Sequence, residues 1–98
     1  MTDAVILAML KVDLGITTEV YDERLAQYIE SAKANIGREG ITLDTEQVDD
    51  CMLIIMYSAW TWRKRADGDG MPRMLRYALN NRLFSEKMRE ATQVTTEG

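Results

Sequence analysis

Histidine is absent from this chain, and cysteine and proline each occur once. A single cysteine cannot form a disulfide within one chain, and a Cys/His zinc site has no ligand set. Cys51 lies inside an apolar run, so we interpret it as a small buried hydrophobe rather than a reactive thiol. This cysteine usage fits a protein made in a reducing cytoplasm.

Long apolar runs and an N-terminal basic segment are also missing. The first residues lack the basic region of a signal peptide and carry Asp3 early. The longest apolar run, 51–62, is shorter than the roughly 20 residues that a membrane-spanning helix needs. We therefore expect neither a signal peptide nor a membrane partner.

The residues that catalysis usually requires are scarce. Without histidine, and with Cys51 buried, nucleophilic catalysis has no evident base or nucleophile, and no glycine-rich phosphate loop is present. Asp49 and Asp50 are neighbours in sequence and would point in different directions on a helix. Asp67 and Asp69 lack the other ligands of a calcium loop, so a plain turn is favoured. We expect a protein that is not an enzyme and uses no cofactor, metal or small-molecule substrate.

What remains has the composition of one globular domain. Of 98 residues, 46% are apolar and 29% are charged, and a chain of this length buries a core without disulfides. Spacing and capping residues predict an all-α bundle of four helices, at about 3–14, 18–37, 44–66 and 71–89. We expect a helical domain over 1–90 and a polar, disordered tail over 91–98.

Local signals support these limits. Thr2 is a plausible N-cap for the first helix, and Gly15 is a natural stop. Asp44 is expected to cap the third helix, with Leu43 and Val48 forming a hydrophobic staple. The third helix is apolar nearly all round, which predicts that it is central and the most buried. One side of the fourth helix is apolar, with Met71, Met74, Leu75, Ala78, Leu79 and Leu83.

Charge is distributed unevenly along the chain. Residues 1–50 carry eleven acids and four bases, whereas residues 51–98 carry five acids and eight bases, so the halves differ in sign within a net charge of −4. Either the halves are two differently solvated faces, or the acidic half of one subunit meets the basic half of a neighbour. If the second hypothesis holds, charge reversal at Arg73 and Arg76 should weaken self-association.

A candidate contact surface lies where the third helix ends and the fourth begins. Its residues are aromatic or basic: Trp60, Trp62, Arg63, Lys64, Arg65, Arg73 and Arg76. Two tryptophans two positions apart cannot both face one core direction, so we expect one to be buried and the other to lie at the domain edge. Tryptophan is enriched among interface anchors, but packing of both within the monomer is an equal alternative.

The same basic residues raise the alternative of a small phage-encoded DNA-binding regulator of the helix-turn-helix type. The pI of about 4.8 argues against it, because direct DNA binders are usually basic. The acidic residues of segment 45–50 would also repel phosphates at the start of the would-be recognition helix.

The order of features resembles another family. The segments that carry the resemblance are LKVD at 10–13, DERLAQYIESAKANI at 22–36, the aromatic and basic end of the third helix from Tyr57 to Arg65, and MPRMLRYAL at 71–79. Over roughly residues 4–85, this order is similar to the small head–tail connector (adaptor, or DNA-packaging) proteins of tailed bacteriophages and prophages. The loop over 65–71 is short for that family, and the segment after Glu90 has no counterpart.

The resemblance implies a structural virion-assembly protein without catalytic residues. Its copies would form a homo-oligomeric ring, twelvefold in the virion, beneath the portal protein. The ring would extend the DNA channel and receive the next connector or tail protein, with DNA only as passing cargo. The implied location is the head–tail junction of the virion, and the host bacterial cytoplasm during assembly.

Overall fold

In a computed structural model, the described part of this protein folds into four α-helices. They are α1 (Asp3–Leu14), α2 (Asp22–Arg38), α3 (Val48–Asp67) and α4 (Arg73–Glu97). The structure describes residues 1–67 and 70–97, with side chains placed in these ranges except at 65–67 and 93–97. Within them there is no strand, so the predicted all-α class is confirmed.

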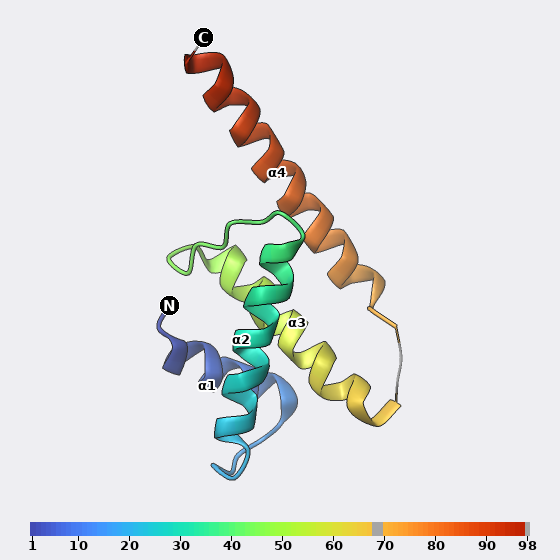
Figure 1. The fold of residues 1–98 in the computed structure, drawn as a ribbon. Helices are drawn as coiled ribbons and strands as arrows, with labels where there is room; N and C mark the ends of the chain where they lie inside the picture. Colours follow the sequence, from blue (N-terminus) through green and yellow to red (C-terminus); the bar gives the residue numbers. More distant parts are fainter. Residues whose placement is uncertain (68–69, 98) are drawn as a thin grey trace.

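Helix α3 is the centre of the bundle, as its composition predicted. It packs against each of the other three helices, and its Cys51 and Ile54 are completely buried (Figure 1). The thiol of Cys51 donates a hydrogen bond to the Thr45 carbonyl at 3.2 Å. The interpretation of this cysteine as a buried residue is therefore confirmed.

Helix α1 begins and ends where its capping residues predicted. The Thr2 hydroxyl accepts a hydrogen bond from the Val5 amide at 3.3 Å. Gly15 has a φ of 71°, the left-handed conformation that glycine adopts at low cost at helix ends. Between these caps, Ile6 and Leu10 are fully buried against the rest of the bundle.

Helix α2 begins at Asp22, four residues later than predicted. The Thr18 hydroxyl accepts a hydrogen bond from the Val20 amide at 3.0 Å, and the Asp22 amide bonds to the Glu19 carbonyl at 3.1 Å. These bonds form a turn instead of a first helical turn. Threonine can cap either structure, so the local sequence did not distinguish them.

Helix α3 begins at Val48, so the expected start at Asp44 is wrong. The Asp44 carboxylate accepts a hydrogen bond from the Glu46 amide at 2.9 Å, which forms a turn within the 39–47 loop. Val48 is 62% exposed, so the expected staple with Leu43 is not buried. Asp44 therefore shapes a loop and does not cap the helix.

Helix α4 begins directly after Pro72, whose carbonyl accepts from the Arg76 amide at 3.1 Å. It continues to Glu97, beyond the predicted end at about 89, so residues 91–97 are helical where a disordered tail was expected. Neither glycine nor proline interrupts the helix, and polarity alone does not end a helix. Gly98 and loop residues 68–69 lie outside the described residues, and the domain limit at 90 stays a prediction.

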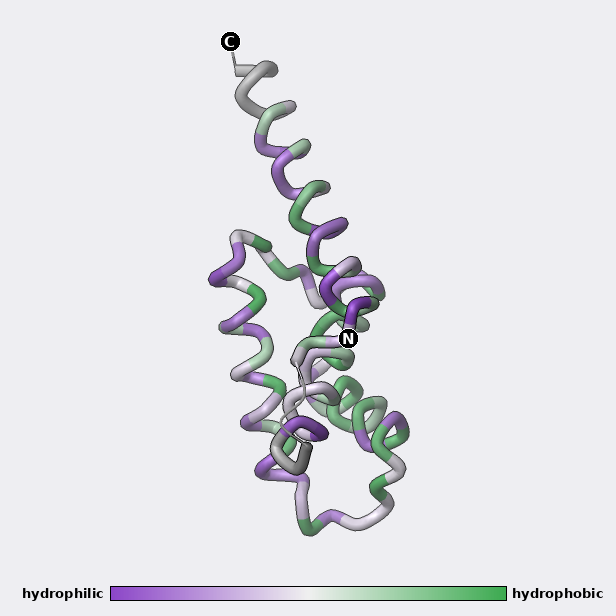
Figure 2. The backbone as a smooth tube through the Cα atoms, turned by 90° about the vertical axis from the view of Figure 1, so that its right-hand side faces the viewer, coloured by the Kyte–Doolittle hydropathy of each residue, from purple (hydrophilic) through white to green (hydrophobic). Residues whose placement is uncertain are grey.

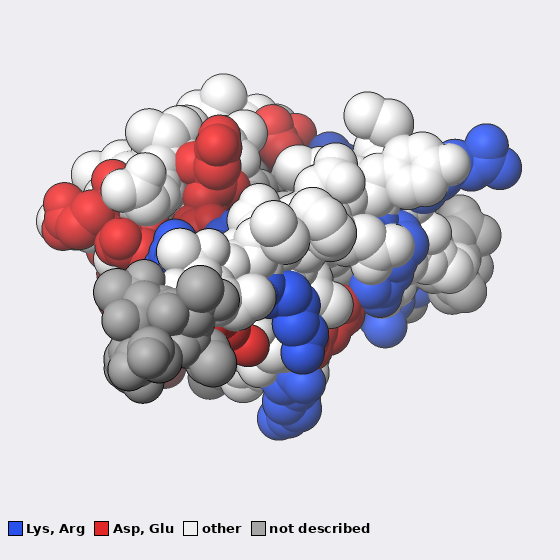
Figure 3. Space-filling view, turned by 90° about the horizontal axis from the view of Figure 1, so that it is seen from above, with Lys and Arg blue, Asp and Glu red and all other residues white. Residues whose placement is uncertain are grey.

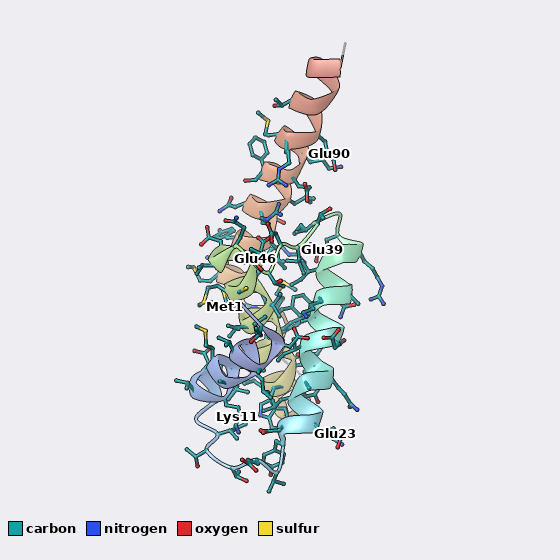
Figure 4. The ribbon with its side chains drawn as sticks, turned by 90° about the vertical axis from the view of Figure 1, so that its left-hand side faces the viewer. Met1, Lys11, Glu23, Glu39, Glu46 and Glu90 are labelled. Atoms are coloured by element: carbon teal, nitrogen blue, oxygen red, sulfur yellow. The ribbon has the colours of Figure 1, made fainter. Side chains whose placement is uncertain are left out.

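The outline of the molecule is set by α4. The protein measures 53 × 28 × 17 Å, and the second half of α4 projects beyond the three-helix body (Figure 1). Figure 2 shows hydrophobic and hydrophilic residues alternating along this projecting part. Figure 4 places Glu90 on it, well beyond the loop that carries Glu39 and Glu46. Met1 lies beside that loop, where its amino group donates to the Thr45 carbonyl.

Candidate protein–protein interface

Three of the predicted contact residues come together at the end of α3. Trp60, Arg63 and Lys64 line a cavity of about 490 Å³ between this end and the start of α4. The remaining lining residues are mainly apolar: Asp13, Met56, Ala59, Gly70, Pro72, Met74 and Leu75. The cavity therefore has an apolar floor and a basic edge.

Trp60 forms one wall of this cavity. Its indole N–H donates to the Gly70 carbonyl at 3.2 Å, and its ring meets Tyr57 edge-on with centroids 5.3 Å apart. The Lys64 ammonium lies 4.5 Å from the centre of the ring, within the range of a cation–π contact. Trp60 thus connects α3 to the segment that precedes α4.

Trp62 faces a different part of the molecule. It meets the rings of Tyr21 and Tyr28 edge-on, at centroid distances of 5.4 and 5.5 Å. These contacts pack the start of α2 against α3. Both tryptophans are half-buried, so the expectation that one is buried and the other marginal is wrong. The two tryptophans point to different sides of α3, and each packs against tyrosine rings.

The basic residues also separate. The Arg76 guanidinium donates to both carboxylate oxygens of Glu39, at 2.8 and 3.2 Å, and this contact raises the pKa of Arg76. Arg63 donates to the Asp13 carbonyl at 3.2 Å, which holds the end of α1. Arg73 is exposed, and the side chain of Arg65 lies outside the described ones. Reversing charge at Arg76 would therefore also loosen α4 from the loop that follows α2.

A buried ion pair was not anticipated. Asp50 as a residue is 2% exposed, and its carboxylate accepts two hydrogen bonds from Arg82 of α4, at 2.7 and 3.3 Å. Arg82 also donates to the Thr42 carbonyl at 2.8 Å. We interpreted Asp50 only as a helix-start charge, because its partner is 32 residues away in sequence. No local pattern reveals such a pairing.

Glu86 completes this buried network. Its carboxylate accepts a hydrogen bond from the Thr42 amide at 2.7 Å and lies 3.6 Å from Arg82. The hydrogen bond from the Thr42 amide is the main cause that lowers the pKa of Glu86. The positive charge of Arg82 lowers it further, whereas burial raises it. The Asp44 amide donates to Asp50 at 2.8 Å. Together these contacts hold α4 against the 39–47 loop at the point where the helix leaves the body.

A second feature of α4 is an exposed row of large apolar side chains, which we call the α4 stripe. Met74, Tyr77, Phe84 and Met88 are 72%, 56%, 66% and 53% exposed. With Asn81 between them, their positions recur at intervals of three and four, so they share one side of the helix. We had placed Met74 on the buried side, which is wrong. The spacing was visible in the sequence, but the buried leucines beside it suggested a single apolar side.

Helix α1 has a similar, shorter row. Val5, Met9 and Val12 are 45%, 37% and 82% exposed, and their spacing of four and three aligns them. We call this row the α1 stripe. Ile6 and Leu10, the buried residues of α1, lie on its other side. The helix is thus apolar both toward the core and toward solvent.

The described part of the chain shows no cluster of Cys, Asp and Glu that could hold a metal ion. None of its helices combines the length and the apolar content needed to cross a membrane. No family model, curated protein or solved structure matches the chain.

Proposed function

We propose that this protein is a structural subunit of a phage or prophage virion, a head–tail connector. Its copies form a ring below the portal, extend the DNA channel and join the head to the tail. Each copy contributes contact surface and no catalytic chemistry. The resemblance in feature order supports the assignment to this family.

The observation that carries the proposal is the projecting part of α4. Phe84, where α4 leaves the body, and Met88, on the projecting part, are both largely exposed. Apolar surface gathered on one protruding element is typical of proteins that bury it against other proteins. A connector must make such contacts on several sides, because it touches its neighbours in the ring, the portal and the tail.

The DNA-binding alternative finds less support. The loop between α2 and α3 has nine residues, from 39 to 47, whereas a helix-turn-helix joins its helices by three or four. The first turn of α3 carries Asp49 and Asp50, and negative charge there opposes approach to phosphates. These features are more consistent with a subunit that lines a DNA channel than with a module that binds DNA tightly.

Binding to a portal ring tests the proposal. The purified chain is mixed with the portal protein encoded in the same genome, and complexes are measured by native mass spectrometry and imaged by electron microscopy. We expect a ring of chains, twelve for a twelvefold portal, on one face of the portal. A chain that ignores the portal and instead shifts a DNA band as a dimer in moderate salt would support the regulator.

A further inference from the structure

The two exposed stripes lie on helices that pack against different sides of α3 (Figure 1). We infer that the α1 stripe of one copy packs against the α4 stripe of the next copy, head to tail. This inference deepens the proposed function, since it names the contact that would join neighbours in the ring.

The stripes have enough apolar surface for a specific contact. At a rise of about 1.5 Å per residue, the α4 stripe is roughly 21 Å long and the α1 stripe roughly 10 Å. From their exposed fractions, the seven side chains offer roughly 700 Å² together. Interfaces are a little over half apolar, so the whole contact would bury at most about 1,200 Å², the value reached if all of this apolar area were covered. That area is at the lower end of the range for specific complexes.

Charge favours contact between unlike stripes. The exposed residues Arg73, Lys87 and Arg89 accompany the α4 stripe, with Glu90 as the acidic exception. Pairing two α4 stripes would bring like charges together, and such contacts are unfavourable.

Beside the α1 stripe lies the acidic residue Asp13, one turn after Met9, while Lys11 of the same helix is paired with Asp22 at 2.7 Å. Asp3 lies on another side of α1, where it is paired with Lys33 of α2, and it keeps 72% of its side chain exposed. Figure 3, seen from above, shows most visible acidic side chains gathered on one side of a broad uncharged band and basic ones toward the other. Arg73, Lys87 and Arg89 beside the α4 stripe and Asp13 beside the α1 stripe are opposite in sign, so contact between these two stripes is favoured.

Symmetry leads to the same choice. A twofold dimer through α4 would leave the α1 stripe of both copies in water. A head-to-tail contact uses a different stripe on each side, so every copy has both stripes covered once the series closes into a ring. Of the two arrangements, only the head-to-tail contact places both stripes of every copy against another copy.

Single substitutions on the stripes separate these arrangements. Val12→Glu disables the α1 stripe and Phe84→Glu disables the α4 stripe. Both residues are largely exposed, so folding should be retained, which circular dichroism and thermal unfolding would check. Val20→Glu is the matched control, because Val20 is 80% exposed and lies in neither stripe.

Sedimentation velocity measures the self-association of each chain. Concentrations reach about a millimolar, because an interface of this size can have a dissociation constant as weak as that. We expect the wild-type chain and Val20→Glu to self-associate. Each stripe variant alone should lose at least tenfold in association. An equimolar mixture of the two variants should form dimers, since each supplies the stripe that the other lacks.

Three outcomes would overturn the inference. In the first, the wild-type chain stays monomeric at about a millimolar. In the second, Val12→Glu alone forms a stable dimer. In the third, the wild type associates but the mixture of the two stripe variants stays monomeric. The proposed function fails separately. If the stripe variants behave as expected but the wild type ignores a portal ring, the contact stands and the connector role does not.

Discussion

Gly40 is the residue whose conformation most directly constrains the path of the chain. Its φ of 102° lies in the region that other residues rarely adopt, and a side chain there would approach the Leu83 methyl group of α4 to 3.3 Å. The absence of a side chain therefore lets the 39–47 loop pass close to α4. Gly37, three residues earlier, is helical and has open space around it.

These two glycines give a matched pair of substitutions. Gly40→Ala should lower the free energy of unfolding by about 1–2 kcal/mol, because it adds backbone strain and a close contact. Gly37→Ala should raise it by about 0.5–1 kcal/mol, because alanine favours the helix. Urea unfolding followed by circular dichroism measures both. Equal effects of the two substitutions would show that the loop does not need glycine at position 40.

Glu86 makes stability depend on pH in a defined direction. Its pKa in the folded chain lies below the ordinary value of 4.5, so the unfolded chain binds this proton more readily. The stabilisation from Glu86 is therefore fully present above pH 4.5 and is lost as the pH falls through the lower folded pKa. Thermal unfolding of the wild type and Glu86→Gln between pH 3 and 7 checks this sign. The gap between their melting temperatures should narrow as the pH falls, and a gap that widens would contradict it.

At the scale of helices, the Asp50–Arg82 pair fixes where α4 meets α3. Both side chains are largely buried, at 4% and 14% exposure. Removing one partner of a buried pair leaves the other charge uncompensated. The pair is also directional, because each oxygen of Asp50 accepts from a different nitrogen of Arg82.

We expect Asp50→Asn to lower the free energy of unfolding by about 2–4 kcal/mol, slightly below the cost of breaking a fully buried pair because Arg82 retains some exposure. Asp49→Asn is the control, since it removes the same charge from an exposed neighbour, and it should change stability by less than about 1 kcal/mol. Guanidinium or urea titrations measure both variants. A similar loss of stability from the two substitutions would mean that the stabilisation comes from negative charge near the start of α3 and not from the Asp50–Arg82 pair.

The helices could be predicted because their signals are local. Thr2, Gly15 and the apolar run after Cys51 act on neighbouring residues, and each was assigned correctly. Asp44 and Asp50 were misinterpreted because their partners are decided by the tertiary fold. Asp44 serves a loop whose path depends on α4, and Asp50 serves Arg82. The residues of the candidate surface do not form one patch, for the same reason. Arg76 and Trp62 contact residues distant in sequence within the same chain, and sequence spacing does not reveal these contacts.

For the whole molecule, the projecting end of α4 adds little to the stability of the isolated chain. The buried residues of α4 in the described part are Leu75, Leu79 and Glu86, and none follows Glu86. A chain truncated after Glu90 should therefore melt within about 4 °C of the full chain, a shift that corresponds to less than about 1 kcal/mol. Differential scanning calorimetry measures the shift. A much larger drop would mean that the end of α4 stabilises the body.

The attachment of α4 also makes it a lever. Its fulcrum is the buried network around Asp50, Arg82 and Glu86, and about eleven residues, or roughly 16 Å of helix, extend beyond Glu86. Over that length, a tilt of about 10° at the fulcrum would move the tip by roughly 3 Å, enough to misalign side chains that must meet in van der Waals contact. The accuracy of any contact made by the outer half of α4 is therefore set by a few hydrogen bonds at its base.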